Sequence, residues 1–189
     1  MLNNYYLSKG VIVVDLKNYP ITSQFGEIDN VHSQPHSGVD IGTKTGTKIY
    51  SQDSGKIHVT VDQWLGNTVR LKLDNGMVVV YGHLSKINVS DGQYVGVGEC
   101  LAETGGAVGS KNSGLTTGEH LHCSLYNSSG QLIDPTDYLF NHNQIQSDTY
   151  SLVFPIMIIL ILIVCWKIKK WLFYGLGLFA LIGIVFLVS

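Results

Sequence analysis

Short segments of alternating hydrophobicity dominate the first three quarters of the chain. In residues 68–73 (TVRLKL), polar and apolar residues alternate, which is the pattern of a half-buried β-strand. An Asp-Asn-Gly turn signal at 74–76 separates this segment from an apolar run at 77–81 (MVVVY), which predicts a β-hairpin. Similar turn signals recur along the chain, and no long amphipathic helix pattern precedes residue 140. We therefore expect an antiparallel all-β domain over residues 20–140.

The C-terminal part of the chain has a different pattern, with long apolar runs. Residues 152–166 and 171–188 contain no charged residue, and a lysine-rich segment at 167–170 lies between them. Because three ammonium groups at the centre of one span would be costly in lipid, we expect two helices, at about 151–166 and 171–188, in a transmembrane hairpin. The alternative is a buried hairpin of a soluble protein, but neither run has a polar face.

These patterns divide the chain into four parts. We expect an N-terminal extension at 1–19, the β domain at 20–140, a polar linker at 141–150 and the two transmembrane helices at 151–188. A short lysine-rich loop tends to stay in the cytoplasm, so the β domain would lie on the opposite side of the membrane. The longest apolar run of the extension, Val11–Val14, is too short for the core of a signal peptide.

Charge and cysteine content exclude several classes of protein. Residues 1–150 contain nine Lys/Arg and fourteen Asp/Glu, a formal charge of −5, and no basic patch typical of nucleic-acid binding. The three cysteines, Cys100, Cys123 and Cys165, form no CxxC motif. They are too few and too scattered for a disulfide framework or a thiolate zinc site.

Three short segments carry residues suited to metal chemistry. In HSGVDIG, His36 and Asp40 lie four residues apart in a stretch whose glycines and β-branched residues disfavour a helix. In GEHLHCSLY, His120 and His122 are two residues apart, so both imidazoles would face the same side of a strand. In YGHLS, His83 follows an apolar strand. Three such strand ends in one β domain can converge on one pocket.

These residue types match the donor set of a catalytic zinc site. Such a site uses three His, Asp or Glu ligands and leaves one position open for water. His36, Asp40 and one histidine of the pair His120 and His122 supply that set, and the residue pattern alone does not choose between the two. The remaining histidine and His83 would then transfer protons or stabilise a developing charge.

In this order and at about this spacing, the three segments resemble the lysostaphin/LytM-type zinc endopeptidases of peptidoglycan. Four framework segments are also similar to that family: ITSQFG at 21–26, GTKIYSQDSGKI at 46–57, DGQYVGVGECLAETG at 91–105 and DPTDYL at 134–139. The resemblance covers about residues 20–140. It implies an antiparallel β-sheet domain of the duplicated hybrid motif type.

The resemblance also assigns roles to the five residues. It implies that His36, Asp40 and His122 bind one Zn²⁺ ion per chain, and that His83 and His120 are the catalytic histidines. The implied activity is hydrolysis of peptide bonds in the cross-links or stems of bacterial peptidoglycan. With the hairpin, the partners would be peptidoglycan and a lipid bilayer. The protein would be an integral protein of a bacterial or viral membrane, with its catalytic domain facing the cell wall.

The sequence departs from the family pattern at three places. Glu119 stands where proline is common, Cys123 stands where an aromatic residue is common, and the loop at 105–118 is long and rich in glycine. These departures bear on the shape of the cleft and on substrate choice, but remove no ligand. Cys123 is expected in the core, on the strand face opposite to the histidines. Three further histidines match no motif and are expected at surface or linker positions: His32, His58 and His142.

Two other classes of function compete with the peptidase. Some domains of this family have lost their ligands and act as non-catalytic wall-binding modules, but every ligand is present here. Alternatively, the hairpin itself could be the active part of a membrane-permeabilising lysis protein. The small size and the unusual architecture suggest a lytic or entry enzyme of a phage or another mobile element.

Overall fold

The structure is a computed structural model that describes residues 5–8, 11–14, 16–29, 33–140, 157–167 and 169. The chain divides into two compact units, Met1–Asn143 and Gln144–Ser189.

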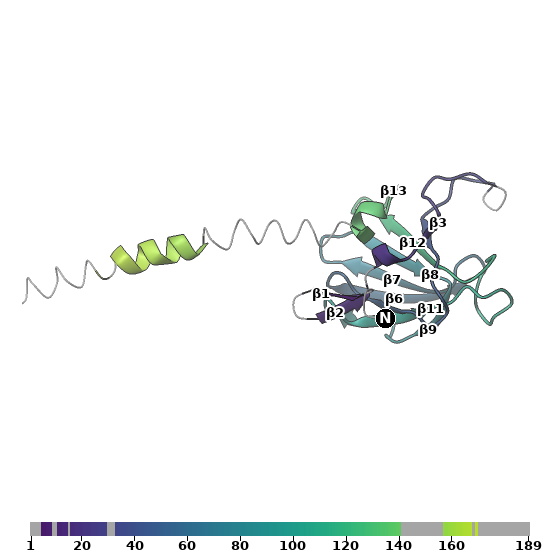
Figure 1. The fold of residues 1–189 in the computed structure, drawn as a ribbon, viewed down its shortest axis with the longest axis horizontal. Helices are drawn as coiled ribbons and strands as arrows, with labels where there is room; N and C mark the ends of the chain where they lie inside the picture. Colours follow the sequence, from purple (N-terminus) through teal and green to yellow (C-terminus); the bar gives the residue numbers. More distant parts are fainter. Residues whose placement is uncertain are drawn as a thin grey trace, which may run out of the picture. The chain divides into compact units, whose positions relative to one another are not determined.

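The first unit is built on an eight-stranded sheet (Figure 1). Its strands follow the order β10-β6-β7-β8-β12-β4-β3, and β13 pairs with β12 outside this path. All of these pairings are antiparallel, as the sequence predicts. The strands are β3 (Ile21–Ser23), β4 (Val39–Ile41), β6 (Gly55–Asp62), β7 (Gly66–Leu73), β8 (Val78–Gly82), β10 (Tyr94–Val95), β12 (Leu121–Tyr126) and β13 (Leu132–Ile133).

Two smaller sheets complete the described β-structure. A three-stranded sheet has the order β5-β11-β9, and β1 and β2 form a separate antiparallel pair. The remaining bounds are β1 (Tyr5–Ser8), β2 (Val11–Val14), β5 (Lys48–Tyr50), β9 (Leu84–Ile87), β11 (Cys100–Thr104) and a 3-10 helix, η1 (Leu16–Asn18). A short helical segment at 136–140 follows β13. The regular secondary structure of the first unit's described part is therefore almost entirely β-strand, connected by loops and turns.

The hydrophobic core joins the two larger sheets. One cluster of buried side chains contains Leu71 and Tyr81 from the eight-stranded sheet and Ile49 and Leu101 from the three-stranded sheet. Each of these side chains is at most 3% exposed. The strands that carry the candidate site are thus supported by a packed core.

The predicted hairpin at 74–76 is confirmed. Strands β7 and β8 pair around it, and Asn75 accepts a hydrogen bond from the Met77 backbone N–H at 3.0 Å. The predicted alternation in β7 fails at one position, because the polar Thr68 is fully buried. Its hydroxyl donates to the Gly66 carbonyl at 3.1 Å, which satisfies the buried oxygen locally.

In the second unit, residues 157–167 are helical and their side chains are exposed. No described helix reaches the length and apolar character that a membrane crossing requires. The predicted hairpin at 151–188 is therefore not supported by the structure. Residues 151–156 and 171–188, together with the expected linker at 141–150, lie outside the described residues.

Replacing Leu71 with Ala should lower the free energy of unfolding by about 2–5 kcal/mol, because this side chain is fully buried in the core. The adjacent Lys72 is exposed, so Lys72→Ala should change the free energy of unfolding by no more than about 0.5 kcal/mol. Denaturant titration of both variants measures this difference. Equal destabilisation by the two substitutions would contradict the assigned faces of β7.

Candidate metal centre

Two antiparallel strands place the first pair of candidate ligands opposite each other. Strand β12 lies between β4 and β8, and its register pairs His122 with Asp40 on one side and with Gly82 on the other. The backbone of Gly38 lies close to β12. A Cβ atom on Gly38 would lie 2.2 Å from the Cys123 carbonyl oxygen and 2.7 Å from His122 Nε2. Only glycine leaves this space free for the imidazole.

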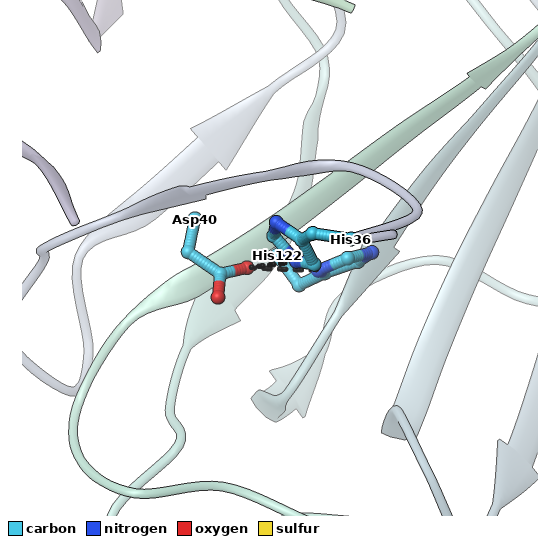
Figure 2. A group of neighbouring side chains, drawn as sticks. All are labelled: His36, Asp40 and His122. Atoms are coloured by element: carbon cyan, nitrogen blue, oxygen red, sulfur yellow. Dashed lines mark hydrogen bonds and ion pairs between the residues drawn. The ribbon is translucent and has the colours of Figure 1, made fainter. Parts of the chain in front are cut away.

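His36 completes a cluster of three candidate ligands with Asp40 and His122 (Figure 2). His36 Nε2 lies 3.1 Å from His122 Nδ1 and 3.3 Å from Asp40 Oδ1. His122 Nδ1 lies 2.8 Å from the same carboxylate oxygen. The structure therefore brings together the three residues predicted to bind zinc.

The dimensions of this cluster fit a small tetrahedral cation. With zinc–ligand bonds of about 2.0–2.2 Å, neighbouring ligand atoms of a tetrahedron lie about 3.3–3.6 Å apart. The observed separations of 2.8–3.3 Å are at or slightly below that value. Two imidazole nitrogens and one carboxylate oxygen are also the donors that zinc prefers. A small outward movement of the three side chains would admit the ion.

All three side chains are buried, with exposed fractions of 3–7%. Burial alone would raise the pKa of Asp40, but hydrogen bonds from His122 and His36 outweigh it and hold the pKa well below its usual range. Burial lowers the pKa of His122. Burial also opposes protonation of His36, but hydrogen bonding and attraction to Asp40 raise its pKa overall. The centre thus combines an ionised carboxylate with two imidazoles.

Hydrogen bonds to the ring nitrogens that point away from the cluster orient the two candidate histidine ligands. His36 Nδ1 lies 3.1 Å from the Gln24 carbonyl oxygen, which can only accept, so Nδ1 carries the proton and Nε2 is left for a metal. His122 Nε2 lies 2.8 Å from the Ser124 hydroxyl, which leaves Nδ1 on the side of Asp40. Such partners set the tautomer and direction of a metal-binding imidazole.

The turn before the first ligand holds His36 through a further network. Ser23 Oγ lies 3.2 Å from His36 Nδ1 and donates to Glu27 Oε2 at 3.2 Å. The same carboxylate oxygen accepts the Gln24 backbone N–H at 2.7 Å. The backbone of His36 also donates to the Glu27 carbonyl at 2.9 Å. Ser23, Gln24 and Glu27 together fix the position of the first ligand.

His83 lies immediately after β8 beside this cluster. Its backbone has a φ of 56°, a left-handed conformation that is uncommon outside glycine and is often found at functional sites. Its Nδ1 donates to the Ser113 carbonyl at 2.7 Å, so Nε2 is free to accept a proton. Burial lowers the pKa of His83 to about 4, which keeps the ring neutral at neutral pH.

His120 faces the same region as His83. The centroids of the two rings lie 4.5 Å apart. His120 Nδ1 donates to the Gly118 carbonyl at 2.8 Å, and its Nε2 lies 3.6 Å from Asp40 Oδ2. His120 therefore contacts the carboxylate oxygen that does not face His122, outside the candidate ligand triad. The structure places both predicted catalytic histidines next to the centre, and their roles stay predictions.

The other residues singled out in the sequence have different surroundings. Cys123 is fully buried in the core, as expected, and burial raises the pKa of its thiol. Glu119 is exposed and accepts the Thr45 backbone N–H at 3.2 Å. His58 pairs with Asp91 at the surface, as expected. His32 and His142 lie outside the described residues.

Sequence reasoning missed the supporting residues of the centre. Ser124 carried a usable signal, because it is two residues after His122 and therefore shares its strand face. Ser23 and Glu27 carried no such signal, since they act through a turn whose path is set only by the fold. The carbonyl groups of Gln24, Ser113 and Gly118 are backbone atoms and leave no trace in residue type.

Ser23→Ala should weaken zinc binding by about 10- to 100-fold, because it removes a hydrogen-bond partner of a ligand imidazole. The measurement is zinc affinity from competition with a chromophoric chelator, beside the thermal melting of the metal-free protein. Ser90→Ala is the matched control, since Ser90 is exposed and remote in sequence from the ligands. Unchanged zinc affinity in Ser23→Ala would contradict the role of the turn.

Comparisons with known proteins agree with this geometry. The sequence profile of peptidase family M23 matches residues 34–135, which include every candidate ligand and catalytic residue. Over 92 residues, the chain is 36% identical to the peptidoglycan DD-endopeptidase ShyA of Vibrio cholerae. That match covers 48% of this chain and 20% of ShyA, so the chain spans about a fifth of the length of this curated relative.

Solved structures show the same fold. The catalytic domain of the antimicrobial peptidase lysostaphin from Staphylococcus simulans matches with a TM-score of 0.57 and 30% identity, over 66% of this chain and 94% of that domain. A zinc-containing peptidase from Vibrio cholerae matches with a TM-score of 0.53 and 28% identity, over 70% of this chain and 38% of that structure. The described β domain has the lysostaphin/LytM-type fold, and the chain belongs to peptidase family M23.

Proposed function

We propose that this chain is a zinc-dependent endopeptidase that hydrolyses peptide bonds in the cross-links or stems of bacterial peptidoglycan. The observation that carries the proposal is the buried triad of His36, Asp40 and His122, which fits zinc and lies beside two further histidines. Membership of family M23 and the similarity to ShyA, a peptidoglycan DD-endopeptidase, support the choice of substrate.

In this proposal, His36 Nε2, Asp40 Oδ1 and His122 Nδ1 hold one zinc ion per chain. The ion would supply Lewis-acid polarisation of the scissile carbonyl and would lower the pKa of a bound water. Asp40 provides the negative charge of the donor set, and its hydrogen bonds keep the carboxylate ionised. The burial of all three ligands limits competition by solvent.

His83 and His120 would handle protons and developing charge. Both rings donate through Nδ1 to backbone carbonyls, so both offer Nε2 to a substrate or to water. A neutral Nε2 accepts a proton as a general base, and the same atom then donates it to a leaving amine or to an oxyanion. The two histidines are thus suited to the two proton transfers of peptide hydrolysis, one in which a proton is accepted and one in which it is donated.

A non-catalytic wall-binding module would not need this arrangement. Five histidine and aspartate side chains converge on one centre, and four of them are at most 7% exposed. Burying so many titratable groups is costly unless they are paired or bind a metal. This cost favours a catalytic centre over a binding surface.

Substitution of the five residues should separate ligands from catalytic groups. His36→Ala, Asp40→Ala and His122→Ala should lose stoichiometric zinc and wall-digesting activity together. His83→Ala and His120→Ala should keep zinc but lower the rate by about 100-fold or more, because proton transfer or oxyanion stabilisation is lost. Metal analysis and digestion of purified cell walls measure the two properties. His58→Ala, at the surface, is the control and should change neither.

Two outcomes would overturn parts of this assignment. A His36→Ala protein that keeps zinc and full activity would refute the ligand set. Loss of zinc in His120→Ala, with retention in His122→Ala, would exchange the roles of these two histidines.

We further propose that the C-terminal segment anchors the catalytic domain at a membrane, on the side that faces the wall. The support comes from sequence: two uncharged runs flank the lysine-rich segment 167–170. A lytic or entry role for a phage or another mobile element remains a prediction.

The anchor can be tested in the full chain with single cysteines in a cysteine-free background. A membrane-impermeant thiol reagent, applied to intact cells, should label Asn143→Cys and Ser189→Cys but not Ile168→Cys. This pattern is expected because a two-span hairpin puts both of its ends on one side. Labelling only at position 168 would mean the reverse orientation, and labelling at 143 without 189 would mean a single span.

A further inference from the structure

Exposed apolar side chains are unevenly distributed over the first unit. In its described part, seven large hydrophobic side chains are exposed, and four of them come from two segments, 61–66 and 106–118. These four are Val61, Trp64, Val108 and Leu115. Trp64 is 61% exposed and Leu115 is 69% exposed. Grouped exposed apolar residues of this kind are a feature of binding sites.

Backbone hydrogen bonds join the two segments. Leu115 N–H donates to the Trp64 carbonyl at 2.9 Å, and Asn67 N–H donates to the Asn112 carbonyl at 2.8 Å. At Gly66, with a φ of 61°, a Cβ atom would lie 2.1 Å from the Asn112 carbonyl oxygen, so the chains touch where only glycine fits. The backbones of Trp64 and Leu115 are therefore adjacent, and both side chains are exposed.

The backbone of Trp64 is held in place although its side chain is exposed. Asp62 Oδ1 accepts the backbone N–H groups of Trp64 at 2.8 Å and of Leu65 at 2.6 Å. A fixed backbone lowers the entropy that an exposed anchor loses on binding. Holding a large indole ring in water brings no stability to the isolated domain, which points to a role in recognition.

The same two segments hold the proposed catalytic His83. Its backbone N–H donates to the Leu65 carbonyl at 2.7 Å, and its Nδ1 donates to the Ser113 carbonyl at 2.7 Å. Trp64 is thus next to Leu65 in the sequence, and Leu115 is two residues after Ser113. The carbonyl groups of Leu65 and Ser113 are the ones that fix His83. Both segments that carry the apolar pair therefore contact His83, which lies beside the metal centre.

We infer that Trp64 and Leu115 form a substrate subsite beside His83 that binds an uncharged, apolar stretch of wall peptide next to the cleaved bond. This inference rests on the proposed function, because it takes the metal centre to be the site of peptide hydrolysis. Tryptophan and leucine offer apolar surface without a charge of their own, and Asp62 Oδ1 accepts two backbone N–H groups beside them. Small apolar side chains match this surface, whereas charged side chains would lose their hydration there.

The test compares the zinc-loaded full chain with Trp64→Ala, Leu115→Ala and the control Tyr94→Ala. Tyr94 is aromatic and 61% exposed like Trp64, but it pairs with Lys56 at the opposite end of β6 from the Trp64 turn. The substrates are purified cell walls and a sugar-free, cross-linked stem peptide. Zinc content and melting temperature are measured beside kcat and KM.

Trp64→Ala should raise KM about tenfold or more for both substrates, because a tryptophan that becomes buried on binding carries a large share of the binding energy. Leu115→Ala should raise KM by a smaller factor. Zinc content, melting temperature and the kinetics of Tyr94→Ala should stay at wild-type values. Unchanged KM in both Trp64→Ala and Leu115→Ala would overturn the subsite.

A defect on whole walls that disappears on the sugar-free peptide would also overturn the inference, since the pair would then bind glycan. If the wild-type chain cleaves neither substrate, the proposed function itself fails. The two failures are distinguishable because the subsite test requires an active wild type.

Discussion

The pairing of β12 with β4 is the constraint on which the rest of the site depends. It sets His122 opposite Asp40, and the pairing of β12 with β8 sets His122 opposite Gly82, directly before His83. A slip of one residue would turn Leu121 or Cys123 toward the carboxylate and send the imidazole into the core. One central strand therefore aligns a candidate ligand pair on one side and a candidate catalytic histidine on the other.

The buried carboxylate of Asp40 explains why so many polar groups gather around it. An ionised carboxylate is costly to bury, and three histidines within 3.6 Å compensate for that cost. The ring nitrogen of each histidine that points away from the carboxylate has its own hydrogen-bond partner. These partners are the carbonyls of Gln24 and Gly118 and the hydroxyl of Ser124.

The sequence predicted the β domain and the candidate residues because both leave local signals. Alternation and turn residues predict strands, and imidazoles and carboxylates at short spacing predict a metal site. The choice between His120 and His122 required the family resemblance, since both share one strand face. Ser23, Glu27 and the Trp64–Leu115 contact depend on how distant turns meet, which no local pattern encodes. The buried Thr68 shows the same limit, because its environment comes from neighbours far along the chain.

The claim at the centre of this account is that three particular atoms bind one metal ion. Anomalous diffraction at the zinc absorption edge, from crystals of the zinc-loaded chain, tests it most directly. The account predicts one strong peak bonded to His36 Nε2, Asp40 Oδ1 and His122 Nδ1, with His83 and His120 outside bonding distance. A peak bonded to His120 in place of His122, or a peak elsewhere with none at this triad, would contradict it.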